Sequence, residues 1–237
     1  MMFTKAIRYA FSGVMALLFP RTCPVCGMLL EGEDDKHICL RCMQRLKRTE
    51  QAVERGNMTE DLFKDEKRFV KGGAFLFYSH GDDNMHNIVR LFKYSRQPMV
   101  AYDIAREGAV EWLQTDFFDD IDIIVPVPLH KRRLRQRGYN QSYYIARAIA
   151  DTIGVPVDTE HLLRRRNNPQ QALLKGEQRT ENVKDLFALT DPMFFVRKHV
   201  LLVDDILTTG STMRSCIRAF DECRGCKVSV FALAKAK

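Results

Sequence analysis

The residues best suited to chemistry lie near the C-terminus, between Val200 and Thr212. Four apolar residues, Val200 to Val203, precede the adjacent carboxylates of Asp204 and Asp205, and the sequence Thr-Thr-Gly-Ser-Thr follows shortly after them. The apolar run predicts a buried strand, and the turn predicts the start of a helix near Met213. The segment therefore predicts a strand, a turn and a helix, with two carboxylates at the carboxyl end of the strand.

The turn after the acids has the composition of a phosphate-binding loop. Backbone N–H groups converge at a helix N-terminus, where the helix dipole also favours an anion, and Gly210 permits the tight geometry. The hydroxyl-bearing residues of the turn are Thr208, Thr209, Ser211 and Thr212. Asp204 and Asp205 would repel a phosphate, so we expect them to accept hydrogen bonds from the hydroxyls of an attached sugar, as a ribose 5-phosphate would provide. The alternative is an ordinary strand–helix junction capped by Thr and Ser.

A basic segment follows another strong strand signal, the run from Ile121 to Pro128, and carries five positive charges in the seven residues 131–137. Arginine forks suit phosphate oxygens, and the carboxyl ends of parallel strands meet at one edge of a sheet. The segment therefore predicts a second anion site, for a pyrophosphate, at His130, Lys131 and Arg132. A solvated basic helix is the alternative.

A long polar segment, 164–182, lies between the two anion-binding segments in the sequence. Long loops in compact domains are usually functional lids or disordered pieces. As a lid, this segment would close over bound ligand and exclude water. The residues that we expect to act there are Arg166, Gln170, Gln171 and Arg179.

Four of the seven cysteines form two Cys-x-x-Cys pairs. The pairs are Cys23 with Cys26 and Cys39 with Cys42. Two such pairs hold one zinc ion between four thiolates, and a site filled by protein ligands is structural. The alternative is two disulfides, which need an oxidising compartment. A further pair, Cys223 and Cys226, has no partner pair, so we interpret it as ordinary helix-end cysteines rather than as a redox or second metal site.

Composition and the N-terminus bound the class of protein. The chain has 237 residues, 46% of them hydrophobic, and a net charge of +7, which suits anionic ligands. No apolar run is long enough for a membrane-spanning helix. The apolar stretch 9–19 follows two basic residues and imitates a signal peptide, but Ser12 and Gly13 interrupt it. We expect an amphipathic helix in a cytoplasmic protein; a helix lying on a membrane surface is the alternative.

Strand and helix signals alternate along the rest of the chain. Strands are expected at 73–78, 121–128, 155–157, 200–203 and 227–233, and helices at 84–94, 98–113, 140–153 and from 213 onward. This order predicts an α/β fold with a mainly parallel twisted sheet flanked by helices. We expect two domains: 1–65, with the N-terminal helix, zinc ribbon and linker, and 66–237, with the sheet. Trp112 is expected in the core.

Taken together, the motifs resemble those of the ComF family over nearly the entire chain. The matching segments are the Cys-Pro-Val-Cys-Gly ribbon, Leu91-Phe92-Lys93-Tyr94, Val125 to His130, Arg137 to Gln141, Arg164 to Gln171, and 200–212, which resembles the phosphoribosyl-diphosphate (PRPP) motif of type I phosphoribosyltransferases. The resemblance implies a type I phosphoribosyltransferase-like fold. It also implies that the turn holds the 5-phosphate of PRPP and that Asp204 and Asp205 hold the ribose 2- and 3-hydroxyls.

The resemblance further implies transfer of a phosphoribosyl group with release of pyrophosphate, with Mg²⁺ bound alongside PRPP, and an association with competence and DNA uptake. Two alternatives stay open. One is a sensor that binds PRPP or a nucleotide without turnover. The other is an accessory of DNA-uptake proteins that binds single-stranded DNA, with Tyr139, Tyr143 and Tyr144 beside the basic run available to stack on bases. The acceptor and the oligomeric state are not defined by the sequence.

Overall fold

The computed structural model describes residues 20–30, 36–79, 83–165 and 186–236. The chain divides into two compact units, Met1–Leu46 and Lys47–Lys237. The division falls before the expected boundary at residue 65, because the segment after Leu46 is bound to the sheet of the second unit: the Thr49 N–H donates to the Phe75 carbonyl at 2.9 Å. The expected N-terminal helix at 9–19 lies outside the described residues.

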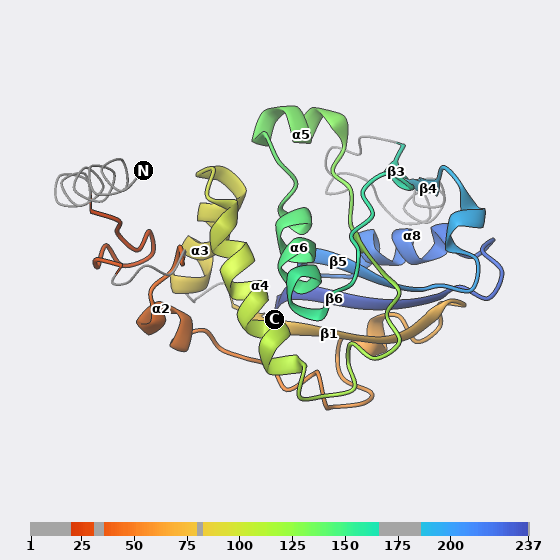
Figure 1. Cartoon of the computed structure of the whole chain (residues 1–237), viewed down its shortest axis with the longest axis horizontal. Coiled ribbons are helices and arrows are strands. Elements are labelled where there is room, and N and C mark those ends of the chain that lie inside the picture. Colours follow the sequence, from red (N-terminus) through yellow and green to blue (C-terminus); the bar gives the residue numbers. More distant parts are fainter. Residues whose placement is uncertain (1–19, 31–35, 80–82, 166–185, 237) are drawn as a thin grey trace, which may run out of the picture. The chain divides into compact units, whose positions relative to one another are not determined.

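The second unit is built on a four-stranded parallel sheet, which confirms the expected α/β class (Figure 1). In spatial order the strands are β1 (Phe69–Tyr78), β6 (Lys227–Ala236), β5 (His199–Leu207) and β2 (Ile123–Pro126). The strand expected at 155–157 is reduced to one bridge between Ile124 and Val157. Strand β5 continues past both acids, because Asp204 and Ile206 stay in register with β6.

Helices cover the sheet. The helices are α3 (Asp83–Tyr94), α4 (Pro98–Trp112), α5 (Lys131–Arg137), α6 (Gln141–Ile153) and α8 (Ser211–Ala219), with 3-10 turns η1 (Glu60–Leu62) and η3 (Pro192–Phe195), and α2 (Leu40–Gln44) in the first unit. Helix α4 packs on α3 and α6, and α6 packs on β5 and β2. None of these helices has both the length and the apolar character needed to cross a bilayer.

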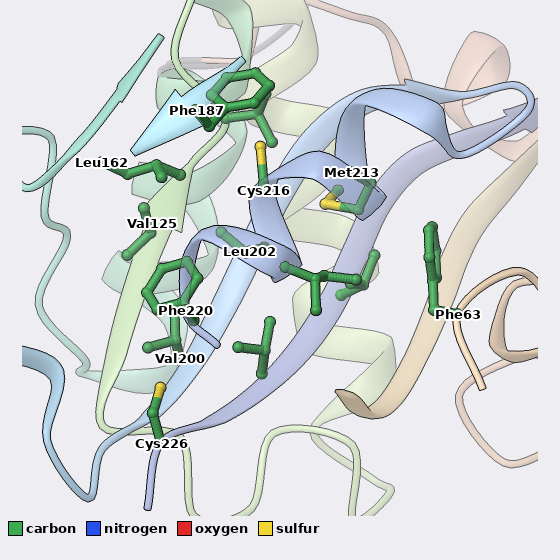
Figure 2. Packing of buried hydrophobic residues seen from close by; sticks show 14 of the residues in the cluster. Phe63, Val125, Leu162, Phe187, Val200, Leu202, Met213, Cys216, Phe220 and Cys226 are labelled. Atoms are coloured by element: carbon green, nitrogen blue, oxygen red, sulfur yellow. The ribbon is translucent and has the colours of Figure 1, made fainter. Parts of the chain in front are cut away.

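Successive side chains of each strand point to opposite faces of the sheet, so apolar residues pack on both faces. On one side, Val200 and Leu202 of β5 pack with Met213 and Cys216 of α8 (Figure 2). On the other side, the Trp112 ring of α4 lies 5.1 Å from the Phe231 ring of β6, and Trp112 is buried as expected. A Cβ at Gly108 would lie 2.8 Å from the Phe75 ring, so this glycine allows α4 to approach β1 closely.

A two-stranded antiparallel sheet was not expected from the sequence. It joins β3 (Leu162–Arg164) to β4 (Phe187–Leu189), and α8 packs against β4. Each strand has only three residues, too few for a period-two pattern to stand out, and their pairing partner lies far away in the sequence. The pair flanks the segment 166–185, which lies outside the described residues.

His199 is a buried titratable group at the amino end of β5. Its Nε2 lies 2.8 Å from the Ser229 hydroxyl, and its Nδ1 has no hydrogen-bond partner in the described part of the chain. Burial, with a smaller contribution from the charge of Lys71, lowers the pKa of His199. The folded protein therefore holds this imidazole neutral.

We predict that His199 makes the protein less stable as the pH falls below about 6.5, the ordinary histidine value. The unfolded chain then takes up a proton that the folded chain resists, at up to about 1.4 kcal/mol per pH unit. Urea unfolding of the wild type and of His199→Gln should show a steeper loss of stability in the wild type between about pH 7 and pH 5. Equal slopes would contradict this assignment.

Candidate functional site

The structure brings two of the predicted segments to the same edge of the sheet. Strand β2 pairs with β5 so that Pro126 lies opposite Val203, and the Val127 N–H donates to the Val203 carbonyl at 2.8 Å. The segment that runs from β2 to His130 therefore begins beside Val203, the residue immediately before Asp204. The side chain of Asn140 fixes this exit by donating to the Val127 carbonyl at 3.0 Å.

The two acids have different surroundings. Asp205 is buried, with its carboxylate 2.9 Å from the Lys93 ammonium of α3. Asp204 is half-buried and accepts a hydrogen bond from the Ser142 hydroxyl in the first turn of α6, at 2.9 Å. Burial, reinforced by the neighbouring charge of Asp205, raises the pKa of Asp204 to about 7. The pair thus carries less than two full negative charges near neutral pH.

The turn after β5 has the predicted form. Thr208 and Thr209 are exposed, Gly210 adopts a φ of 75° as the N-cap of α8, and the Thr209 hydroxyl lies 3.3 Å from that of Ser211. A Cβ at Gly210 would meet the Phe63 ring at 3.0 Å. Only glycine combines this backbone with this close approach. Thr212 lies in the first turn of α8 and is half-buried.

Residues 62–66, from a segment that the sequence suggested was a linker, contact the helix that follows this turn. Arg214 of α8 donates to the Leu62 carbonyl, and Glu66 accepts from Arg214 and Arg218 at 3.1 and 2.9 Å. Its carboxylate side chain is only 8% exposed, so two cations compensate a nearly buried charge. Residues 62–66 are therefore part of the structure that positions α8.

The predicted pyrophosphate residues begin helix α5. His130 is its N-cap, and Nδ1 of His130 accepts from the Arg132 N–H at 3.2 Å. This contact assigns His130 a capping role and fixes its tautomer with Nδ1 unprotonated. Lys131 and Arg132 are exposed. Their side chains are available to an anion at this edge of the sheet.

Arg164 lies where β3 leads toward the segment outside the described residues. Its guanidinium lies 5.4 Å from the Phe187 ring centroid, and its buried Nε has no hydrogen-bond partner among the described residues. Burial, with the nearby charge of Arg133 adding to it, lowers the pKa of Arg164, whereas Cys216 and Asp204 act in the opposite direction. The predicted lid residues Arg166, Gln170, Gln171 and Arg179 lie outside the described residues.

Three neighbours of the site were not assigned a role from the sequence: Lys93, Ser142 and Lys235. The Lys235 ammonium, from β6, donates to the Thr208 carbonyl at 3.1 Å and places a cation beside the turn. Lys93 lies in the Leu91–Tyr94 motif and Ser142 directly follows the Arg137–Gln141 motif, but nothing in the sequence indicates that either side chain contacts the acids. Only the register of β5 with β6 and the packing of α3 and α6 bring them to the acids.

The four ribbon cysteines form one cluster in the first unit. The potential ligand atoms of Cys23, Cys26, Cys39 and Cys42 all lie within 4.8 Å of one another. Tetrahedral zinc with bonds of about 2.3 Å requires sulfur atoms about 3.8 Å apart, so the cluster fits. The Sγ atoms of Cys26 and Cys39 lie 3.6 Å apart. The Cys42 N–H donates to the Cys39 Sγ, a hydrogen bond of the kind that orients thiolate ligands.

Cys223 and Cys226 behave as core residues. Both are buried, and burial raises the pKa of each thiol, that of Cys226 to about 12. A thiol held protonated in this way is a poor nucleophile and metal ligand. Their surroundings favour the interpretation as ordinary helix-end cysteines.

Comparison with known proteins gives two domain matches. Residues 140–237 match the phosphoribosyl transferase domain, and residues 14–53 match the double zinc ribbon domain. In the described part of the chain, the ribbon match corresponds to a single cluster of four cysteines.

Two curated relatives are similar over about half of the chain. DNA utilization protein YhgH of Escherichia coli (strain K12) is 33% identical over 129 residues, which cover 53% of this chain and 56% of that protein. Competence protein F of Haemophilus influenzae is 30% identical over 116 residues, which cover 48% of this chain and 51% of that protein. The chain thus spans about half the length of the curated relatives it matches.

Among solved structures, adenine phosphoribosyltransferase from Leishmania tarentolae aligns with 80% of this chain and 94% of its own, with 13% identity and a TM-score of 0.39. That similarity is too low to bear on function.

We predict that the purified protein contains zinc held by the ribbon. Cys23→Ser should lose the metal and unfold the first unit, because a segment this small depends on its metal to fold. Cys223→Ala, which removes a buried thiol from the other unit, should retain the metal. Elemental analysis and proteolysis of the three proteins test this, and a zinc-free wild type that resists proteolysis in the ribbon would disprove it.

Proposed function

Because this chain is a member of the ComF/YhgH family, in which a zinc ribbon precedes a phosphoribosyltransferase domain, we propose that it binds PRPP and transfers its phosphoribosyl group to an acceptor, with release of pyrophosphate. The observation that supports the proposal most is the edge of the sheet where β5 ends. Two carboxylates in the last residues of β5 are followed, after Ile206 and Leu207, by the hydroxyl-rich turn that begins α8. The type I phosphoribosyltransferase-like α/β fold supplies the parallel sheet on which such an edge depends.

Each part of this edge has a chemical role in the proposal. The turn from Thr208 to Thr212 holds the 5-phosphate through backbone N–H groups and hydroxyls. The acid pair accepts hydrogen bonds from the ribose hydroxyls and fixes the sugar ring. Lys131 and Arg132 meet the pyrophosphate at the start of α5, where His130 caps the helix.

During transfer, the bond between the anomeric carbon and the pyrophosphate oxygen breaks as the acceptor forms its own bond to that carbon. The protein contributes position and electrostatic stabilisation rather than a covalent intermediate. Positive charge develops on the sugar, where the acid pair lies, and negative charge develops on the leaving group, where the basic residues lie. Mg²⁺ bound alongside PRPP would neutralise part of the pyrophosphate charge.

A second candidate function is binding of single-stranded DNA, in keeping with the words "DNA utilization" and "competence" in the names of the relatives. The observation that favours it is helix α5. Lys131, Arg132, Arg133 and Arg135 are all exposed there, and none forms an ion pair with a described carboxylate. Nearby, the Arg137 guanidinium lies 5.3 Å from the ring centroid of Tyr94, a side chain 70% exposed. Exposed cations beside an aromatic ring suit a flexible phosphate backbone.

We predict that the double variant Asp204→Asn plus Asp205→Asn loses PRPP affinity by at least about a hundredfold, since charge-assisted hydrogen bonds contribute about 1.5–3 kcal/mol each. Calorimetric titration with PRPP and Mg²⁺ measures the loss. The matched control is Asp119→Asn plus Asp120→Asn, an adjacent and exposed acid pair elsewhere in the same unit, which should bind as the wild type does.

Retained affinity in the site variant would overturn the assignment of the acid pair.

A separate assay tests turnover: pyrophosphate release by the wild type is measured with candidate bases and amines as acceptors. Tight PRPP binding by the wild type without release for any acceptor would favour the sensor over the transferase.

For DNA, we predict that replacing Arg132, Arg133 and Arg135 with Gln reduces the salt dependence of single-strand binding. Each phosphate contact contributes about 0.7 to the slope of log affinity against log salt, so the slope should fall by about 2. Fluorescence anisotropy with a labelled oligonucleotide measures it. Arg106→Gln plus Arg147→Gln, on α4 and α6, is the control, and equal slopes for all three proteins would exclude α5 as the contact surface.

A further inference from the structure

The turn that begins α8 carries backbone donors that no other part of the described chain uses. The N–H groups of Thr209, Gly210, Ser211 and Thr212 donate to no described residue. The first N–H groups of a helix lack acceptors within the helix itself. They hold an anion only when they point toward the same place. The orientation of each peptide plane in the turn therefore decides whether the turn binds a phosphate.

Lys235, near the end of β6, contacts the first residue of this turn. Strand β6 lies between β1 and β5, and Lys235 is in register with Leu207, the last residue of β5 (Figure 1). From this place its ammonium donates to the Thr208 carbonyl at 3.1 Å and to the Ala236 carbonyl at 2.9 Å. Two of the three N–H donors of the ammonium thus bind backbone oxygens, one of them in the turn.

The contact with Thr208 sets the direction of the next N–H group. The peptide bond between Thr208 and Thr209 is trans. In a planar trans peptide the C=O and the N–H point in opposite directions. Because Lys235 holds the Thr208 carbonyl on its own side, the Thr209 N–H points away from Lys235. A reversed peptide would place a carbonyl oxygen where this N–H lies, and the oxygen would repel an anion.

The charge of Lys235 is not balanced by a carboxylate. Lys235 is half-buried and forms no ion pair within the described ranges of the chain. Burial lowers the pKa of Lys235. A cation that is partly withdrawn from water is stabilised by an anion nearby. A phosphate bound at the turn would supply that negative charge.

The other end of the turn is fixed by packing. Gly210, the N-cap of α8, has a φ of 75°, and a Cβ there would lie 3.0 Å from the Phe63 ring. Phe63 thus limits movement at Gly210, while Lys235 holds Thr208 two residues earlier. A site whose donors are held at both ends loses little entropy when the ligand binds.

We propose that Lys235 is a positioning residue for phosphate binding: it holds the Thr208 carbonyl and thereby turns the Thr209 N–H toward a phosphate monoester at the start of α8. The proposal rests on the proposed function and adds to it a residue from a strand that carries none of the predicted site residues. Lys235 acts through the peptide plane, and its charge adds to the attraction of the anion.

The test is calorimetric titration with ribose 5-phosphate. Lys235→Met keeps the length of the side chain but removes the donor, so affinity should fall about tenfold, as for the loss of one charge-assisted hydrogen bond. Lys235→Arg should recover most of the loss. The matched control is Lys227→Met, an exposed lysine at the start of the same strand, which should bind as the wild type does. Pyrophosphate with Mg²⁺ should bind equally to all four proteins, since its predicted residues begin α5.

Salt separates positioning from the effect of charge alone. A charge that acts through solvent is screened at about 1 M salt, where the Debye length is about 3 Å, whereas the orientation of a hydrogen-bonded peptide is not. The loss of affinity in Lys235→Met should therefore persist in KCl at about 1 M. A loss that disappears in salt, an unchanged affinity, or an equal loss for pyrophosphate would overturn the proposal. Lys235→Gln gives the same comparison if Lys235→Met folds poorly.

Failure of the proposed function is distinguishable from failure of this inference. If the wild type binds neither ribose 5-phosphate nor PRPP, the proposed function fails. NMR of the ligand-free protein then tests Lys235 alone. In Lys235→Met the carbonyl carbon resonance of Thr208 should move upfield, as expected when a carbonyl loses a charged donor, and in Lys227→Met it should stay in place. An unmoved Thr208 resonance in Lys235→Met refutes the contact.

Discussion

Strand β5 carries two adjacent carboxylates in the interior of the second unit, and neighbouring elements must supply partners that stabilise their charge. Their mutual repulsion and their desolvation both oppose the ionised state. The ladder between β5 and β6 holds them in place, since Asp204 stays in register with Ala232. Lys93 of α3 pairs with the Asp205 carboxylate, and the Ser142 hydroxyl of α6 donates to Asp204; both contacts stabilise the buried charge. The orientation of both helices at their ends serves this requirement.

The turn that follows the acids depends on a different set of neighbours. Gly210 rests on Phe63, and Arg214 is bonded to the Leu62 carbonyl. These contacts come from a segment that precedes β1 and lies far from the turn in the sequence. A phosphate loop needs a rigid base because its backbone N–H groups must stay aligned. The segment around Phe63 provides that base.

The first unit, which contains the cysteine ribbon, differs from the second in how its fold can be stabilised. A unit this small buries too little apolar surface to fold by packing alone, and a zinc ion held by the four thiolates would compensate for the small core. The second unit has an apolar core built around β5 and α8. Cys216, Cys223 and Cys226 accordingly pack within its apolar interior.

Local chemistry explains which features were predictable. The Cys-x-x-Cys spacing, the apolar run before Asp204 and the periodicity of α3, α4 and α6 are each contained in a few consecutive residues, and the structure has all of them. The β3–β4 pair was missed because its three-residue strands pair across a long sequence separation. The polar composition of residues 50–67 suggested a linker, but in the structure Asn57 and Thr59 are buried. The Asn57 amide donates to the Gly72 carbonyl of β1, and the Thr59 hydroxyl donates to Gln51, contacts that no local pattern indicates.

By itself, the sequence determined the α/β class, the cluster of four ribbon cysteines and the strand–turn–helix formed by β5 and α8, because each depends on neighbours along the chain. Tertiary structure alone decided which partners Asp204 and Asp205 have. Sequence proximity makes them appear a symmetrical pair, but the partners that distinguish them, Lys93 and Ser142, arrive from helices more than 60 residues away, at separations that only packing can close. Charge compensation in a folded protein is set by distance in space, and no local pattern encodes it.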